Sequence, residues 1–281
     1  MRDSQETGFA MEDLKKKVTE LQEIIGSLQK VIVAFSGGTD STLLLRYAKE
    51  ILEDKAIAVT AASEIIPEKE VEEAKRVAAE IGAEHQIIFL KPLQNADFVA
   101  NPPERCYYCK QALCAQLKDI AKQEGALHII DGTNKDDAKD FRPGQKAASE
   151  WGLRSPLLEA GLTKEEIRIL SKRLNLPTWD KPSKACLASR FPYGQKITKE
   201  KLKRVEEAEE AIGELGLKQV RVRLHDENTA RIEVEQEGIE RLLGADERTQ
   251  IVRKLQKLGF IYITVDLRGY QTGSLNELIR E

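Results

Sequence analysis

The chain has 281 residues, of which 41% are hydrophobic, so it is long enough to bury a sizeable core and to form two domains. Its formal net charge of -3 and its pI of 5.9 give no global electrostatic reason to bind nucleic acid, so we expect small molecules as substrates. The first ten residues lack a signal peptide's basic start and apolar core, and no apolar stretch reaches the roughly 18 residues of a membrane span. We therefore expect a cytoplasmic protein without a membrane partner.

Apolar runs typical of buried strands alternate with amphipathic stretches over most of the first 195 residues. The expected strands are 31–35, 56–63, 86–90 and 128–133, and the expected helices are 11–30, 67–82 and 106–124. Thr163 and Glu166 have the spacing of a capping box before a further short helix. This alternation predicts an α/β fold with a doubly wound parallel sheet, whose ligand site lies at the carboxyl ends of its strands.

The pattern changes near residue 198. A charged helix to about residue 215 is followed by strands at 220–224, 230–234 and 262–267 and by a helix at 246–258. The strands alternate apolar with polar residues, which predicts a small antiparallel or mixed sheet with one polar face. We expect two domains, 1–195 and a smaller α+β domain at 196–281.

Glycines lie where the first buried strand turns into a helix, in the sequence SGGTDS at 36–41. Adjacent glycines let the backbone approach an anion, and the amides of the following helix start attract it. The stretch lacks the Lys ending of a Walker A loop and instead resembles the PP-loop of the N-type ATP pyrophosphatases. The predicted ATP-binding residues are Ser36, Gly37, Gly38, Thr39, Asp40 and Ser41, joined by Ser63, Asp131 and Gly132 at neighbouring strand ends.

Asp40 would repel a triphosphate unless a divalent cation lay between them, so we expect it to bind Mg2+. Ser36 and Ser41 can donate their hydroxyls to phosphate oxygens, although capping of the helix is an equal alternative for Ser41.

The sequence contains four cysteines, which in a reducing compartment are more often thiols, ligands or catalytic groups than disulfides. Cys106 and Cys109 lie at the predicted start of a helix with two residues between them, a spacing that fits half of a zinc site, a redox dithiol or part of an iron–sulfur site. Cys114 lies on the apolar stripe of the same helix, which favours core packing. Cys186, in a polar loop at 179–194, is the better third ligand, and three thiolates would leave one iron of a [4Fe-4S] cluster open.

Arg221 and Arg223 alternate along one predicted strand, so their side chains share a face and could grip a phosphate together. The alternative is a solvated or salt-bridged face, with Glu233 or Glu235 on a neighbouring strand as partner.

Six motifs in order give a resemblance over nearly the whole chain: SGGTDS, RCYYCK, DGTNKDD, FRPG, CLASRFPYG and VRVRLH. With them the chain resembles the LarE sulfur transferases, which act in making the nickel-pincer nucleotide cofactor. The resemblance implies that ATP adenylates a carboxylate of pyridinium-3,5-biscarboxylic acid mononucleotide, that pyrophosphate leaves, and that sulfur replaces the adenylate to give a thiocarboxylate. It also implies a PP-loop domain joined to a small substrate-binding domain, assembled as a homo-oligomer, often a hexamer.

One branch of this family sacrifices the sulfur of a single cysteine at the position of Cys186. This chain has Cys106 and Cys109 as well, and so resembles the three-cysteine branch that carries a [4Fe-4S] cluster. The resemblance makes these three cysteines the cluster ligands, with sulfide on the cluster as the transferred sulfur and free sulfide or a persulfide carrier as its donor. It places Lys110 beside the ATP and assigns substrate binding to Ser189, Arg190, Glu209, Arg221 and Arg223.

Other functions stay open from the sequence. A PP-loop tRNA thiolase also pairs ATP with three cysteines, although the acidic balance speaks against RNA. An amide-forming ligase resembling NAD or GMP synthetases would leave the cysteines incidental. A nucleotide-sensing protein would bind ATP without releasing pyrophosphate.

Overall fold

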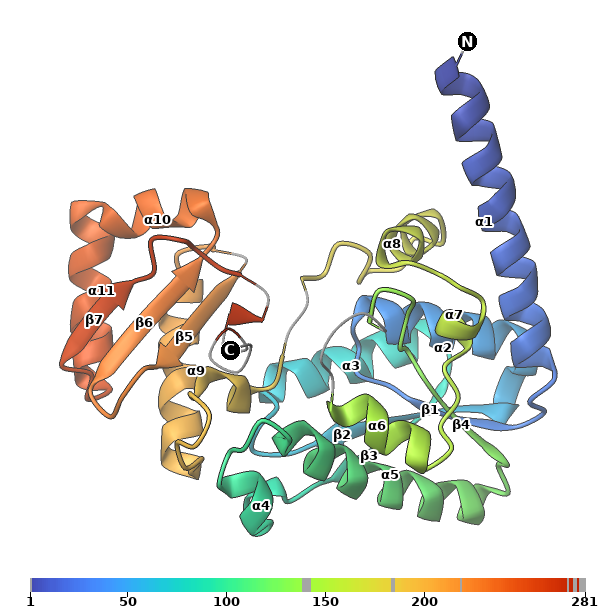
Figure 1. Ribbon diagram of the computed structural model, residues 1–281, viewed down its shortest axis with the longest axis horizontal. Helices are drawn as coiled ribbons and strands as arrows, with labels where there is room; N and C mark the ends of the chain where they lie inside the picture. Colours follow the sequence, from blue (N-terminus) through green and yellow to red (C-terminus); the bar gives the residue numbers. More distant parts are fainter. Residues whose placement is uncertain are drawn as a thin grey trace. The chain divides into compact units, whose positions relative to one another are not determined.

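A computed structural model describes residues 2–137, 143–182, 185–217, 219–271, 273, 274 and 277, with side chains described from residue 11 onward (Figure 1). The chain packs into two compact units. The first unit comprises Met1–Ser63, Glu68–Leu90 and Cys106–Ser183, and the second unit comprises Glu64–Pro67, Lys91–Arg105 and Lys184–Glu281. The functional division at residue 195 stays a prediction. Phe141 and Arg142 of the FRPG motif lie outside the described residues.

The first unit is built on a parallel sheet in the order β3-β2-β1-β4. Its strands are β1 (Val31–Ala34), β2 (Ala56–Ala62), β3 (Glu84–Phe89) and β4 (His128–Asp131). Helices of this unit are α1 (Arg2–Gly26), α2 (Thr39–Leu52), α3 (Glu68–Ile81), α5 (Arg105–Glu124), α6 (Pro143–Glu150), α7 (Pro156–Glu159) and α8 (Lys164–Arg173). The predicted doubly wound α/β fold is confirmed.

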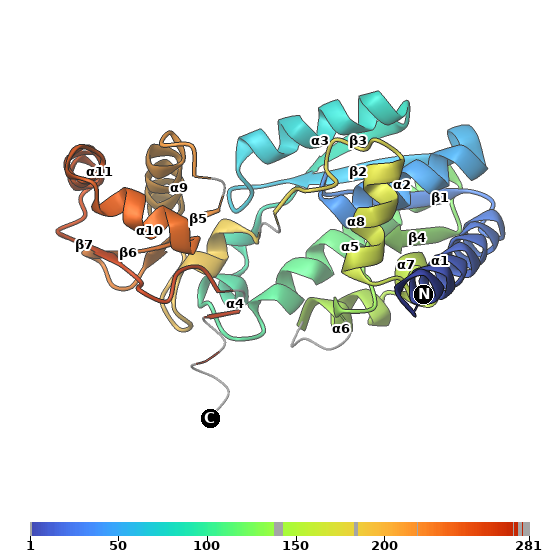
Figure 2. The ribbon, with the colours of Figure 1, turned by 90° about the horizontal axis from the view of Figure 1, so that it is seen from above.

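Alternate residues of β1 face opposite sides of this sheet, because side chains alternate along a strand. Val31 and Val33 pack into a core with α1, α2, α3 and α8, whereas Ile32 packs with Leu117 and Ala121 of α5 on the other side. Figure 2 shows α5 and α3 on opposite sides of the sheet. Both faces of β1 are therefore covered, and its carboxyl end leads into the glycine loop before α2.

The second unit contains a mixed sheet in the order β5-β6-β7, antiparallel between β5 and β6 and parallel between β6 and β7. Its strands are β5 (Val220–Leu224), β6 (Thr229–Val234) and β7 (Tyr262–Val265), and its helices are α4 (Ala96–Val99), η4 (Leu187–Arg190), α9 (Lys199–Gly213), α10 (Gln236–Leu243) and α11 (Ala245–Lys257). The expected polar face is wrong for β5: all five of its residues are buried, including both arginines. Their charges are accommodated by partners described below.

Four short helices were not expected from the sequence: α4, α6, α7 and α10. Two short 3₁₀ helices are also present, η1 (Glu53–Lys55) in the first unit and η2 (Pro92–Gln94) in the second unit. Within the described residues, no helix combines the length and apolarity that a membrane crossing requires.

The capping box at the start of α8 gives a test of local stability. Thr163 Oγ1 accepts from the amide of Glu166 at 3.3 Å, and the Thr163 amide donates to Glu166 Oε2 at 2.8 Å. We expect Thr163→Ala to lower the free energy of unfolding by about 1 kcal/mol. Thr249→Ala is the matched control, because Thr249 lies inside α11 and bonds back to the Ala245 carbonyl, and it should change stability by less than about 0.5 kcal/mol. Equal shifts of the urea midpoint in both variants would contradict the role of the cap.

Candidate functional site

The glycine loop after β1 is held by close backbone contact. Gly37 has a φ of 66°, a conformation that favours glycine, and a Cβ there would lie 3.0 Å from the Cα of Ala74 on α3. The loop therefore lies directly against α3, which sets where α2 begins.

The first turn of α2 begins without a side-chain cap. Its N-cap residue is Gly38, which has no side chain to accept from the amides of that turn. The capping alternative for Ser41 is thus not observed: its hydroxyl lies 3.0 Å from that of Ser36 and donates to the Gly38 carbonyl at 3.2 Å. A helix start with a positive dipole and no carboxylate or hydroxyl at its N-cap favours an anion. This is the geometry expected of a phosphate-binding turn.

Asp40, the predicted Mg2+ ligand, is held by two side chains from later in the chain. Lys164 Nζ lies 2.6 Å from Asp40 Oδ2, and Asn134 Nδ2 donates to Asp40 Oδ1 at 3.4 Å. One carboxylate beside a triphosphate fits the way Mg2+ is usually bound, with phosphate and water completing the octahedron. A divalent cation at Asp40 would take the place that the Lys164 ammonium holds.

Asp131 and Gly132, at the end of β4, adjoin the same turn. A Cβ on Gly132 would lie 2.9 Å from the amide nitrogen of Ser41, so only glycine fits there without displacing α2. Asp131 is 6% exposed and accepts hydrogen bonds from Lys110 Nζ at 3.3 Å and Ser155 Oγ at 2.8 Å. The predicted phosphate-neutralising Lys110 thus lies beside a carboxylate of the same site.

These contacts set the charge of Asp131. Burial alone would raise the pKa of this carboxyl group, but the charge of Lys110 and the hydrogen bonds from Ser155 and Thr133 outweigh burial and hold the pKa below its ordinary value. Asp131 is therefore a carboxylate at neutral pH.

Ser63 follows β2, on the same edge of the sheet. Its hydroxyl oxygen is buried and has no hydrogen-bond partner within the described residues. A buried hydroxyl of this kind would be stabilised by a polar ligand, and the place of Ser63 in the ATP site stays a prediction.

The four cysteines, all in the described part of the chain, are thiols. Cys106 and Cys109 lie near the start of α5 in the first unit, and Cys186 immediately precedes η4 in the second unit. Cys114 is fully buried, as core packing predicts, and burial raises the pKa of its thiol. Among the residues that the structure describes, no three His, Cys, Asp or Glu side chains form a group that could hold a metal ion. Cys106 and Cys109 lie three positions apart on α5, so their thiols could serve one metal centre, and Cys186 as a third ligand stays a prediction.

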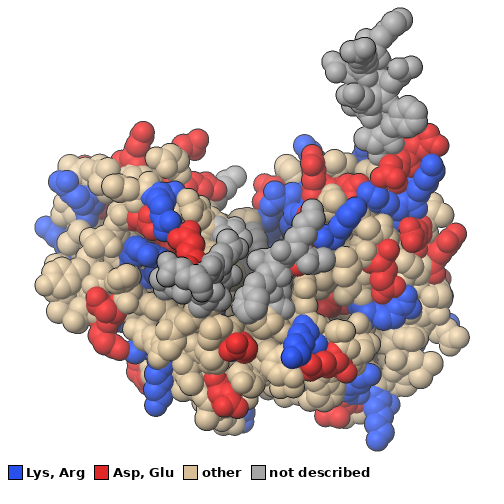
Figure 3. Space-filling model, in the orientation of Figure 1, with Lys and Arg blue, Asp and Glu red and all other residues tan. Residues whose placement is uncertain are grey.

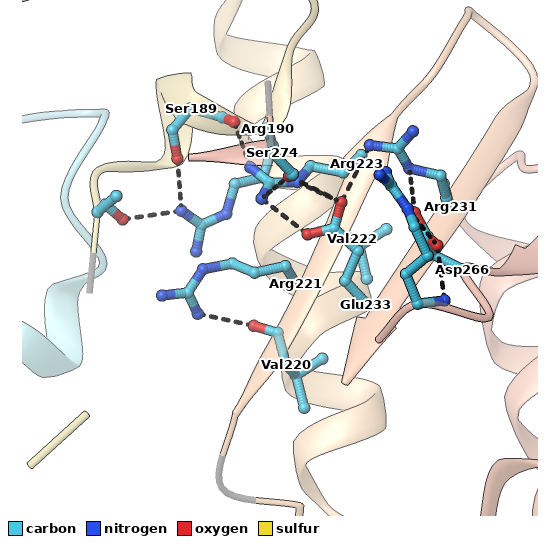
Figure 4. Close-up of polar contacts among 12 residues, drawn as sticks. Ser189, Arg190, Val220, Arg221, Val222, Arg223, Arg231, Glu233, Asp266 and Ser274 are labelled. Atoms are coloured by element: carbon cyan, nitrogen blue, oxygen red, sulfur yellow. Dashed lines mark hydrogen bonds and ion pairs between the residues drawn. The ribbon is translucent and has the colours of Figure 1, made fainter. Parts of the chain in front are cut away.

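Arg190 is the buried centre of the second predicted site (Figure 4). It is 3% exposed, and its Nε and Nη2 donate to the two carboxylate oxygens of Glu209 at 2.7 and 2.8 Å. Burial would lower the pKa of Arg190, but the Glu209 hydrogen bonds and charge outweigh burial and raise it. Glu209 also accepts from the amide of Val222 at 2.9 Å, which ties α9 to β5.

Arg221 and Arg223 do not share one environment. Arg223 donates to both carboxylate oxygens of Glu233, at 3.0 and 2.7 Å, so the salt-bridged alternative describes it. Arg221 is 4% exposed, with its guanidinium 5.3 Å from the ring centre of Tyr270. Burial and then the positive charge of Arg190 lower the pKa of Arg221, although Glu209 opposes this.

The predicted site residues therefore fall into two groups. The first unit holds the glycine loop, Ser63, Lys110, Asp131, Gly132, Cys106 and Cys109, and the second unit holds Cys186, Ser189, Arg190, Glu209, Arg221 and Arg223.

On the face drawn in Figure 3, acidic and basic side chains are interspersed, in agreement with the small net charge.

Sequence reasoning missed Lys164 and Lys181. Lys181 Nζ donates to the Gly37 carbonyl at 3.1 Å and to Glu73 at 2.8 Å, so it also holds the glycine loop. Neither lysine lies in a glycine or cysteine motif, and Lys164 reaches Asp40 across 124 positions. Of the side chains that contact Asp40, only Asn134 could have been found from the sequence, because it lies within the DGTNKDD motif.

Comparison with known proteins places these features in context. A family model described as NAD synthase matches residues 10–127. Pyridinium-3,5-bisthiocarboxylic acid mononucleotide synthase of Lactiplantibacillus plantarum is 40% identical over 96% of this chain and 97% of its own length. An uncharacterized protein of Synechocystis is 43% identical over 95% of this chain and 99% of its own length. The glutamine-hydrolyzing GMP synthase of Aeropyrum pernix is 27% identical over 69% of this chain and 42% of its own length.

Gly132 gives a test of the glycine contact. We expect Gly132→Ala to weaken ATP binding about tenfold or more, because a clash of this kind typically costs about 1–3 kcal/mol and would move the first turn of α2. Isothermal titration with ATP measures it. Gly213→Ala is the control, since a Cβ there meets nothing within 4 Å. Wild-type affinity in Gly132→Ala would show that this turn does not hold the nucleotide.

Lys110 gives a test by pH. The pKa of Asp131 is lower in the folded than in the unfolded protein. Its ionised form therefore stabilises the fold fully at pH values above its ordinary pKa of 3.8. This stabilisation is lost as the pH falls through the pKa of the folded state. Lys110→Met removes the largest influence that lowers this pKa. We expect its acid unfolding midpoint to move to higher pH. Lys118→Met, an exposed lysine on the same helix, should leave the midpoint unchanged. A shift as large in Lys118→Met would point to overall charge instead.

Proposed function

Since this chain belongs to the LarE family of pyridinium-3,5-bisthiocarboxylic acid mononucleotide synthases, we propose that it is an ATP-dependent sulfur transferase that converts the carboxylates of pyridinium-3,5-biscarboxylic acid mononucleotide into thiocarboxylates. The observation that carries the proposal is 40% identity over 96% of the chain, in a protein whose glycine loop has the geometry of a phosphate site. The product would serve synthesis of the nickel-pincer nucleotide cofactor.

In the first half of the proposed reaction, ATP binds the glycine loop, Ser63, Asp131 and Gly132. A carboxylate oxygen of the substrate attacks the α-phosphorus, the bond between the α-phosphorus and the bridging oxygen breaks, and pyrophosphate leaves. The product of this step is an acyl-adenylate, which makes AMP the leaving group of the next step. Asp40 would bind Mg2+ in place of the Lys164 ammonium, and Lys164 and Lys110 would then stand beside the phosphates.

Arg221 is the strongest candidate for the anchor of the substrate phosphate. Its surroundings disfavour its own positive charge, because burial and Arg190 lower its pKa, so a bound anion would stabilise it. Ser189, Arg190, Glu209 and Arg223 would complete this end of the site, and the protein contacts of Arg190 and Arg223 support a role in holding its shape.

In the second half, sulfur attacks the acyl carbon and AMP leaves with the bonding electron pair. We propose that Cys106, Cys109 and Cys186 hold a [4Fe-4S] cluster, which when bound supplies a deprotonated sulfide that free sulfide or a persulfide carrier renews. Two thiols near the start of α5, three positions apart, support this assignment, because one metal centre can bind both. A homo-oligomer, hexameric as in the family, is the proposed assembly.

The test of this function is product formation by the anaerobically reconstituted protein. The protein is incubated with the biscarboxylated nucleotide, Mg-ATP and sulfide, and the products are followed by mass spectrometry. We expect AMP, pyrophosphate and several thiocarboxylate groups formed per chain. Cys186→Ala should lose both the absorption near ~400 nm that makes the protein brown and its repeated turnover. Cys114→Ala is the control and should keep both, because that thiol is buried in the core.

Three outcomes would contradict the proposal in different ways. One product per chain with loss of the Cys186 sulfur would indicate sacrificial chemistry. Sulfur incorporated into tRNA would indicate a thiolase. ATP bound without substrate-dependent pyrophosphate release would indicate a nucleotide sensor.

A further inference from the structure

The backbone around Cys186 is held by two arginines. We define the Cys186 turn as residues 185–190, which include η4 (Leu187–Arg190). Arg190 Nη1 donates to the carbonyls of Ala185 at 2.8 Å and Cys186 at 3.1 Å. Arg223 Nη1, from β5, donates to the carbonyl of Ser189 at 2.6 Å. Guanidinium groups thus fix the backbone carbonyls before and after the Cα of Cys186.

Each of these guanidinium groups is in turn oriented by one carboxylate. Glu209 binds Arg190 through both oxygens, and Glu233 binds Arg223 through both oxygens. A bidentate carboxylate fixes the plane of a guanidinium as well as its position. In Arg223, the bond of Nε and Nη2 to Glu233 leaves Nη1 directed at Ser189, as Figure 4 shows.

Glu233 is the most deeply buried member of this network. It is 0% exposed, and it also accepts from Arg231 Nη2 at 3.0 Å and Ser274 Oγ at 3.4 Å. It lies on β6, one strand away from the arginine that touches the turn. A buried arginine that loses its carboxylate keeps its charge and must find other acceptors, so it would not keep the same orientation.

Arg231 is the second arginine that binds the carboxylate of Glu233. Both Arg223 and Arg231 bind Glu233, but the described hydrogen bonds of Arg231 go only to Glu233, with Asp266 as a further ion-pair partner. Between these two arginines, Arg223 is the one whose described contacts extend the network to the Cys186 turn. The effect of Glu233 on the turn can therefore be separated from its effect on the sheet.

We propose that Glu233 is a positioning residue for sulfur transfer: it aligns Arg223, whose Nη1 holds the Ser189 carbonyl and so fixes the turn that carries Cys186. The role in sulfur transfer rests on the function proposed above, whereas the positioning of Cys186 does not. A displaced turn would move Cys186, a proposed ligand of the sulfur-supplying cluster, and leave the ATP-binding residues of the first unit unaffected. The expected defect is thus confined to the second half of the reaction.

The first experiment measures Cys186 directly, without reference to catalysis. Protein freed of iron by chelator and reductant is labelled with iodoacetamide, and each cysteine is followed by peptide mass spectrometry. In Glu233→Gln we expect the labelling rate of Cys186 to change at least about threefold, because thiol reactivity follows local environment. The rates of Cys106 and Cys109 should stay as in the wild type. An unchanged Cys186 rate would overturn the proposal.

The second experiment separates the two half-reactions in the reconstituted protein. We expect Glu233→Gln to lower kcat for thiocarboxylate formation at least about tenfold, since small misplacement of reacting groups has effects of this size. Without added sulfide, we expect each chain to release one pyrophosphate as it forms the acyl-adenylate. The amount of this pyrophosphate and the KM for ATP should both stay within about twofold of the wild-type values. A loss of both half-reactions together would indicate general damage and overturn a specific positioning role.

Two further variants keep the test decisive. Arg223→Lys keeps a positive charge beside Glu233 but removes the Nη1 that reaches Ser189, and it should reproduce the Cys186 labelling change even if Glu233→Gln fails to fold. Arg231→Met is the matched control, because it removes a contact with Glu233 without a described contact to the turn, and its labelling should match the wild type. An equal change in Arg231→Met would overturn the proposal. If the wild type forms no product, the proposed function fails, and labelling alone still decides the positioning of Cys186.

Discussion

The close approach of backbones at the start of α2 is the constraint on which the first unit depends. Gly37 lies against Ala74 of α3, and Gly132 lies against the amide of Ser41, so the first turn of α2 is held between a helix and the end of β4. A side chain at either glycine would separate elements that the parallel sheet otherwise brings together. Because the turn is fixed by main-chain contacts, its amides can face a ligand without a side-chain cap, and the helix start keeps its attraction for anions.

The charges around this turn are arranged in pairs that a nucleotide would rearrange. Asp40 is paired with Lys164 and Asp131 with Lys110, and in each pair both side chains are at least partly buried. Partly buried pairs are less screened by solvent than surface pairs, so the two lysines are held beside their carboxylates. If triphosphate and its metal bind as proposed, the metal would compensate the carboxylate and each lysine would be released to face phosphate. The proposed site would then need few new charges to accept a highly anionic ligand.

The sequence predicted the parts of the fold that arise from local pattern. The four strands of the first sheet, the glycine turn and the Thr163 cap follow from apolar runs and from residue types with strong backbone preferences. Short helices such as α10 were missed, because eight residues give too little periodicity. The expected polar face of β5 was wrong, since alternation of valine with arginine cannot distinguish exposed charges from charges buried against a carboxylate on the next strand.

The candidate site shows the same limit at the level of single contacts. Lys164 reaches Asp40 only because α8 packs beside α2, and no local pattern encodes that neighbourhood. The resemblance to a known family grouped Arg221 with Arg223, because the two occupy one motif and alternate along one strand. Position in a motif does not reveal the partner of a side chain, which is set by the neighbouring strand and by the turn before α9.

The two arginines of β5 therefore have different physical capacities. Arg223 is bound by a fully buried carboxylate, so its charge is already compensated and its geometry is fixed. Burial and then the like charge of Arg190 lower the pKa of Arg221, so a bound anion would favour its charged form. If the substrate phosphate binds as proposed, Arg223 would hold the Cys186 turn while Arg221 bound the anion. One strand would then supply both a fixed turn and a charge for the ligand.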